Sequence, residues 1–266
     1  MVPPIDSEND LESLKKLVLL SSKMLYAPNE ITEVPIEFSQ GGHVSARLPQ
    51  GDRFMIAAYI RGDGRTFLND LTLEDIVTVD LDGNVQEPGR KPVGEVIIHS
   101  AVYKARPDVN SVVHVHPFWS TTLSIAGKRI LPVGTSYGHY FPDGVPLLDT
   151  GFGWLVTEEH GRALARALGP GNAVVHKGHG IVVGEKSVYD SVVTTVALEL
   201  LAKQQAHASL LGSPRPYSRE EMQAYYDRAG GKMWKGSARA RWLWYERRLR
   251  EKGMALESKK VKGFKG

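Results

Sequence analysis

Residues 112–117, with the sequence VVHVHP, place two histidines one residue apart at the end of an apolar run. The run favours a β-strand, and Pro117 ends it because proline has no N–H to donate to a neighbouring strand. Alternate side chains of a strand share a face, so His114 and His116 point the same way. Two imidazoles on one face at a strand end are either half of a metal site or a pair of surface or hydrogen-bonded histidines.

A third histidine, His179, interrupts another apolar run, at 174–183, within the tripeptide Gly-His-Gly. The flanking glycines allow a sharp turn and a close approach to a neighbouring strand. A catalytic divalent metal commonly has three protein ligands and one open position. His114, His116 and His179 are therefore candidate metal ligands. His176 is a reserve ligand, although we expect it to form a hydrogen bond elsewhere.

Glu95 lies at the predicted start of a helix, where the helix dipole favours a carboxylate. It is the candidate fourth ligand, able to leave the metal and act as an acid or base. His99 is one turn further along the same helix face, where it either orients Glu95 or pairs with it. We place His99 around the metal site and not among its ligands.

Composition limits the chemistry. The 266 residues include no cysteine, so disulfides and thiolate ligands are excluded and a metal must be held by His, Asp or Glu. No stretch reaches the roughly 18 apolar residues of a membrane span, and the N-terminus does not resemble a signal peptide. We expect a cytoplasmic protein with no membrane or nucleic-acid partner. The basic C-terminal segment around Trp242, Trp244 and Tyr245 is interpreted as a solvated helix face with aromatic residues packed beneath it.

Helical and strand patterns alternate along the middle of the chain, which favours one layered α/β domain over residues 1–266. Ser7 is expected to cap the first helix, with Asp10 as its capping-box partner. Further helices are predicted at 118–126, 157–168 and 187–211. Strands are predicted at 43–47, 53–60, 76–81, 130–133, 145–148 and 174–183.

These features together resemble the class II aldolase/adducin family. The resemblance spans about residues 10–212, and the remaining residues 213–266 would form C-terminal helices and a basic tail. It implies a three-layer α/β/α fold around a mixed, largely antiparallel sheet. The motifs that carry it are Glu95, the segment YKARPDV at 103–109, His114-Val115-His116-Pro117 placed 19 positions after Glu95, and His179-Gly180.

The resemblance implies one divalent metal ion per subunit, Zn, Mn, Fe or Co, held by His114, His116 and His179. Glu95 would be a further ligand and the catalytic acid/base. Members of the family often form ring-shaped tetramers with active sites at subunit boundaries, so a homotetramer is expected.

The chain departs from the sugar-phosphate aldolases of the family, which bind phosphate through an Asn and pairs of small hydroxyl residues. The corresponding positions are His43, residues 59–63 and Val93-Gly94. A phosphate site is therefore missing its parts, and a small-molecule carboxylate is the expected substrate. His43, Ser45 and Arg47 are candidate substrate contacts, and Arg47 could bind a carboxylate through two hydrogen bonds. Its alternative is an arginine on the surface at a strand edge.

The sequence looks most like the decarboxylase branch of the family, which acts on hydroxylated aromatic or heteroaromatic dicarboxylates. Decarboxylation, like aldol cleavage, leaves a carbanion that a metal can hold as an enolate. Glu95 or its water is expected to return the proton. The rivals are Tyr137 and His139, in a Gly-rich loop after a strand, and a residue from a neighbouring subunit. Three alternatives remain: an aldolase acting on a non-phosphorylated hydroxy-keto acid or a sugar phosphate, a non-haem iron oxygenase with two histidines and Glu95 as ligands, and a structural module.

Overall fold

The computed structural model describes residues 10–27, 29–32, 34–37, 41–58, 71–151, 153–228 and 237–254. The strands are β1 (His43–Arg47), β2 (Arg53–Ala57), β3 (Ile76–Asp80), β4 (Ser111–Val115), β5 (Leu147–Leu148), β6 (Ala173–His176) and β7 (Gly180–Glu185). The helices are α1 (Leu11–Tyr26), α2 (Asn29–Thr32), the 3-10 turn η1 (Leu73–Asp75), α3 (Val96–Ala105), α4 (Phe118–Ile125), α5 (Thr135–Gly138), α6 (Glu158–Leu168), α7 (Val188–Leu211), α8 (Arg219–Arg228) and α9 (Ser237–Glu251).

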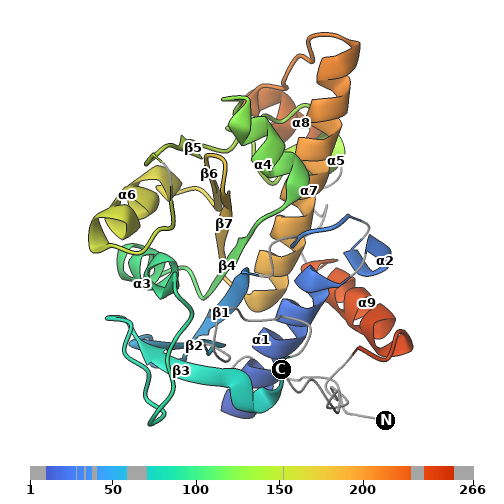
Figure 1. Cartoon of the computed structure of the whole chain (residues 1–266). Helices are drawn as coiled ribbons and strands as arrows, with labels where there is room; N and C mark the ends of the chain where they lie inside the picture. Colours follow the sequence, from blue (N-terminus) through green and yellow to red (C-terminus); the bar gives the residue numbers. More distant parts are fainter. Residues whose placement is uncertain are drawn as a thin grey trace, which may run out of the picture.

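The strands form one sheet in the order β3-β2-β1-β4-β7-β6-β5 (Figure 1). Every neighbouring pair is antiparallel except β5 and β6, which are parallel. The predicted mixed, largely antiparallel sheet is therefore confirmed. The histidine strand, β4, lies at its centre, between β1 and β7.

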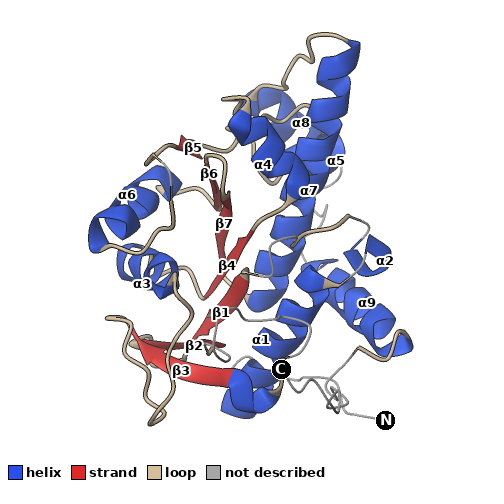
Figure 2. Ribbon diagram, viewed as in Figure 1, coloured by secondary structure: helices blue, strands red, loops and turns tan. Residues whose placement is uncertain are grey.

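Helices cover both faces of the sheet. Figure 2 shows α3 and α6 on one side and α1, α7 and α9 on the other. Because both faces of β4 are covered, its apolar side chains are fully buried, including Val112, Val113 and Val115. This explains why β4 reads as a continuous apolar run, and it confirms the α/β/α layers.

The first helix begins one residue after Asp10, whose side chain accepts a hydrogen bond from the Ser13 amide at 2.9 Å. Asp10 is therefore the cap of α1, and not a capping-box partner. The predicted cap, Ser7, lies outside the described residues. The C-terminal aromatic residues pack inward as expected: Trp242 and Tyr245 of α9 are fully buried, and the Trp242 indole donates to Ser21 Oγ.

The predicted strand at 130–133 is wrong. Only an isolated bridge joins Ile130 to Val145, and the strand predicted at 145–148 is reduced to the two residues of β5. Gln205 of α7 takes the backbone groups that a strand would pair: its amide accepts from the Leu131 N–H at 2.7 Å and donates to the Arg129 carbonyl at 2.8 Å. Within the described residues, no helix is long and apolar enough to cross a membrane.

Candidate metal centre

The centre of the sheet brings the three predicted histidines together. His114 and His116 come from β4 and the residue after it, and β4 pairs with the start of β7 through Val115 and Ile181. His179 lies in the tight turn between β6 and β7, where its amide donates to the His176 carbonyl at 3.1 Å. The turn thus holds His179 beside the end of β4.

The close approach of this turn requires glycine at position 180. A Cβ atom there would lie 2.5 Å from the Val115 carbonyl oxygen and 3.0 Å from His116 Cδ2. Gly178 also has a positive φ of 68°. The two glycines around His179 therefore serve the roles that the sequence predicts for them.

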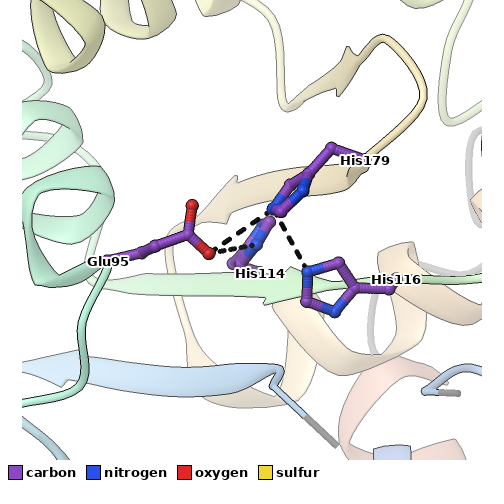
Figure 3. Close-up of side chains that lie close together, drawn as sticks. All are labelled: Glu95, His114, His116 and His179. Atoms are coloured by element: carbon purple, nitrogen blue, oxygen red, sulfur yellow. Dashed lines mark hydrogen bonds and ion pairs between the residues drawn. The ribbon is translucent and has the colours of Figure 1, made fainter. Parts of the chain in front are cut away.

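Glu95 completes a four-residue group (Figure 3). Its Oε2 lies 3.4 Å from both His114 Nε2 and His179 Nε2, and His116 Nε2 lies 3.3 Å from His179 Nε2. One ligand atom from each residue lies within 4.8 Å of the others. Ligands about 2.1 Å from a tetrahedral zinc ion are roughly 3.4 Å apart, so these separations match a metal centre.

The hydrogen bonds of the imidazoles suit a bound cation. His114 Nδ1 donates to the Ile181 carbonyl at 2.9 Å, which leaves an unprotonated Nε2 facing Glu95. Burial lowers the pKa of His114, so the ring is neutral. His114 Nε2 is buried and has no hydrogen-bond partner among the described residues. A nitrogen lone pair opposed to a carboxylate oxygen is unfavourable unless a cation lies between them, so the four residues fit a divalent metal.

Glu37, which sequence reasoning missed, orients His116. Its buried carboxylate accepts hydrogen bonds from the His116 amide and from His116 Nδ1, both at 3.0 Å. The ring is thereby held with Nε2 toward the other ligands, as carboxylates commonly do for metal-bound histidines. Gly42 makes room for it, since a Cβ there would lie 2.4 Å from Glu37 Oε2. Glu37 and His116 are 79 positions apart, so no local sequence pattern connects them.

A second missed contact fixes Glu95. The Leu155 amide donates to Glu95 Oε1 at 2.8 Å, which leaves Oε2 for the histidines. Glu95 is the residue before α3, but its side chain does not cap that helix. Burial favours the neutral carboxyl, but positive charge on His114 and His179, or on a cation bound between them, lowers the pKa of Glu95, so the group is ionised at neutral pH.

His43 and Ser45 lie on β1, beside the metal group. The His43 ring is 5.1 Å from the His114 ring, centroid to centroid, and these residues are cross-strand partners. His99 contacts His43 and Ser45 through hydrogen bonds of 2.6 Å each. The prediction that His99 surrounds the site without being one of the grouped ligands agrees with this geometry, although its partners are not Glu95.

Arg47 differs from its predicted role. Its guanidinium donates to four backbone carbonyls, and it lies over the Tyr103 ring at 4.5 Å. These bonds tie β1 to the end of α3 and the following loop, and they occupy the donors that a substrate carboxylate would need. The structure therefore makes Arg47 a support for the backbone. The carbonyls it binds belong to Gly51, Tyr103, Arg106 and Val109.

Three other candidates lie outside the four-residue group. His176 Nε2 bonds to Thr150 Oγ1 at 2.9 Å, as expected for a histidine that is not a ligand. Tyr137 lies on the short helix α5, which packs against α7 and α8, and His139 Nδ1 donates to the Thr135 carbonyl there. The predicted Gly-rich loop after a strand is thus a helical turn. The proposed phosphate-loop residues 59–63 are outside the described residues.

Comparison with known proteins identifies the fold. Residues 36–206 match the family model of the Class II Aldolase and Adducin N-terminal domain. The chain belongs to this family. The class II aldolase fold is also that of an aldolase II superfamily protein from Pseudomonas syringae, whose crystal structure matches with a TM-score of 0.75 and 22% identity, over 94% of this chain and 97% of the other.

Curated class II aldolase relatives carry out three different reactions. A 3,4-dihydroxyphthalate decarboxylase from Terrabacter sp. is 30% identical over 64% of this chain and 73% of its own length. An L-ribulose-5-phosphate 4-epimerase from Salmonella paratyphi C is 31% identical over 50% of this chain and 62% of its own length. An L-fuculose phosphate aldolase from Methanocaldococcus jannaschii is 32% identical over 61% of this chain and 82% of its own length. These relatives are enzymes that act on small molecules.

Proposed function

We propose that this protein is a divalent-metal-dependent carbon–carbon lyase that decarboxylates a hydroxylated aromatic or heteroaromatic carboxylate. The observation that carries the proposal is the pair of residues before Glu95. Val93 is an apolar, buried side chain and Gly94 has none, so neither offers a hydroxyl donor for a phosphate. The similarity to a decarboxylase of a dihydroxylated aromatic dicarboxylate supports the same substrate class.

The protein's own groups suit this reaction. His114, His116 and His179 would hold the metal, while Glu95 is ionised and lies on the same side of the group. A bound divalent cation would supply a Lewis acid that stabilises the negative charge left when carbon dioxide departs. A carboxylate beside a phenolic hydroxyl is the substrate feature that allows this charge to reach an oxygen.

The reaction must also return a proton to carbon. The bond to the carboxyl group breaks, carbon dioxide leaves without the electron pair, and the ring carbon takes up one proton. Glu95 is the best-placed group to deliver it, directly or through a water molecule, because its Oε2 faces the ligands while Oε1 is fixed by Leu155. Tyr137 and His139 remain weaker candidates, since α5 packs on other helices.

We also propose that the working form is a homo-oligomer, with a tetramer as the expected state. Two large apolar side chains next to the centre are exposed in the single chain: Phe118, two residues after His116, at 52%, and Trp154, beside Leu155, at 68%. Exposed apolar side chains near a site are typical of surfaces that another subunit covers.

A substrate panel tests the proposed reaction. Metal-reconstituted protein is incubated with 3,4-dihydroxyphthalate, with sugar phosphates and with hydroxy-keto acids, and carbon dioxide and carbonyl products are measured separately. We expect carbon dioxide from the aromatic dicarboxylate, its loss in His114→Ala, and its retention in His160→Ala, which removes an imidazole of α6 outside the metal group.

Aldol cleavage is the second candidate, because the aldolase relative is similar over 82% of its own length. Pyruvate or an aldehyde among the products, without carbon dioxide from the aromatic acid, would contradict the decarboxylase proposal and support the aldolase. Carbon dioxide release that persists in His114→Ala would contradict the assigned site.

A further inference from the structure

A buried chain of four polar side chains leads away from the metal group. His43 Nδ1 lies 2.6 Å from His99 Nε2, His99 Nδ1 lies 2.6 Å from Ser45 Oγ, and Ser45 Oγ lies 2.7 Å from the Tyr103 hydroxyl. Exposure of these four side chains is 2% or less. The proposed reaction assigns no role to His99 or Tyr103.

The Tyr103 hydroxyl sets the direction of this chain. Burial raises the pKa of Tyr103 above its usual value, so the phenol keeps its proton. Ser45 Oγ is the acceptor within reach of this hydroxyl among the described side chains, so Tyr103 donates to Ser45. The Ser45 proton then has one remaining partner, and it is donated to His99 Nδ1.

The same logic continues through the two histidines. A ring nitrogen that accepts a hydrogen bond carries no proton, so such a ring holds its proton on the other nitrogen. With Nδ1 accepting from Ser45, His99 carries its proton on Nε2 and donates it to His43 Nδ1. His43 must then carry its own proton on Nε2.

The reverse direction is unfavourable. If His43 Nδ1 donated to His99, then His99 would donate to Ser45 and Ser45 would donate to Tyr103. The Tyr103 hydroxyl would then have no acceptor in the chain. A buried donor without an acceptor is strongly unfavourable. The forward direction satisfies each donor within the chain and leaves the N–H of His43 Nε2 outside it.

We propose that Tyr103, Ser45 and His99 are positioning residues that make His43 a fixed hydrogen-bond donor, through Nε2, to an anionic oxygen of the substrate. The inference rests on the proposed function for the identity of the substrate, but the proton positions do not depend on it. It also changes the role predicted for Ser45, which orients His43 through His99 and is not itself a substrate contact. His43 and His114 are cross-strand partners with rings 5.1 Å apart, so the donor lies beside the metal group.

Nitrogen NMR of histidine-labelled, zinc-loaded protein tests the proton positions directly, because the two neutral tautomers differ in their ¹⁵N shifts. The His43 signals are assigned as those that disappear in His43→Gln. We expect the Nε2–H tautomer of His43 in the unmodified protein and a second tautomer in Ser45→Ala, which breaks the chain. Ser100→Ala is the matched control, since it removes a buried hydroxyl beside His99 that has no hydrogen-bond partner within the described residues. An Nδ1–H tautomer in the unmodified protein, or no change in Ser45→Ala, would overturn the proposal.

Binding of phthalate and of inorganic phosphate to the zinc-loaded protein tests the donor. We expect His43→Leu to weaken binding of one of these anions about 10-fold, the effect of losing a hydrogen bond to a charged group, and His43→Gln to restore part of it. A loss for phthalate identifies a carboxylate as the partner, and a loss for phosphate identifies a phosphoryl oxygen. Unchanged binding of both would overturn the donor role. A correct tautomer without carbon dioxide release would count against the proposed function alone.

Discussion

The carboxylate of Glu37 accepts two hydrogen bonds from His116, one from its amide and one from its ring, each 3.0 Å long. The bonds fix both the strand end and the direction of the ring. A candidate metal ligand is therefore oriented by a residue that precedes it by 79 positions.

Replacing Glu37 with Gln is expected to weaken metal binding roughly 10- to 100-fold, because the ring of His116 loses its charged acceptor. Competition with a chromogenic chelator measures this affinity. Glu87→Gln is the matched control, since Glu87 accepts from the Thr78 amide on β3, in another part of the sheet. Equal affinities for the two variants would contradict the role of Glu37.

Replacing Gly180 with Ala tests the close approach of the His179 turn. A Cβ atom 2.5 Å from the Val115 carbonyl must push the turn away from β4, which we expect to cost about 1–3 kcal/mol of unfolding free energy and to weaken metal binding. Urea unfolding gives the first quantity. Gly212→Ala, at a position with open space, should change neither property. A stable Gly180→Ala protein with normal metal affinity would show that the turn is not tightly constrained.

Replacing Arg47 with Lys separates a structural role from a substrate contact. The four carbonyls that Arg47 serves cannot all be reached by one ammonium group, so we expect a loss of about 3 kcal/mol in unfolding free energy. Denaturant titration without substrate measures the loss. A variant of normal stability but raised KM would return Arg47 to the substrate-binding role that the sequence predicted.

Glu199 of α7 gives the protein a stability that depends on pH. Its carboxyl accepts hydrogen bonds from the Trp119 and Ser120 amides at the start of α4, and burial raises its pKa to about 7 despite these bonds. The folded state therefore keeps this proton between pH 4.5 and 7, while the unfolded state loses it. Unfolding free energy should fall by about 3 kcal/mol as the pH rises through that range.

Urea titrations of the unmodified protein and of Glu199→Gln, at several pH values between 4.5 and 8, isolate this contribution. The variant lacks the titrating group, so the difference in unfolding free energy between the two proteins should decrease with rising pH and become constant above about pH 7. A difference that does not change with pH would show that Glu199 titrates normally.

The sequence predicted the site best where the positions of the histidines depend on local backbone geometry. The alternation of His114 and His116 in a strand, and the glycines around His179, placed three imidazoles in one group because strand and turn geometry are local properties. The fold followed from the same motifs through the family resemblance.

The failures have a common physical cause, since each depends on a contact between distant segments. Arg47 resembled an anion-binding residue, but three of the four carbonyls it serves come from the end of α3 and the loop after it, which the sequence does not place beside β1. Residues 130–133 have a strand pattern, yet Gln205 of α7 supplies the hydrogen bonds that a strand would use. Glu37 and Leu155 were missed because a carboxylate before a strand, or an amide in a loop, carries no local signature.

Metal stoichiometry tests the central structural claim most directly. Protein dialysed against a low concentration of divalent metal and then against metal-free buffer is analysed by inductively coupled plasma mass spectrometry, together with His114→Ala and His160→Ala. We predict one tightly bound divalent ion per chain in the unmodified protein and in His160→Ala, and almost none in His114→Ala. No bound metal in the unmodified protein, or equal metal in all three proteins, would contradict the assignment of Glu95, His114, His116 and His179 as one metal centre.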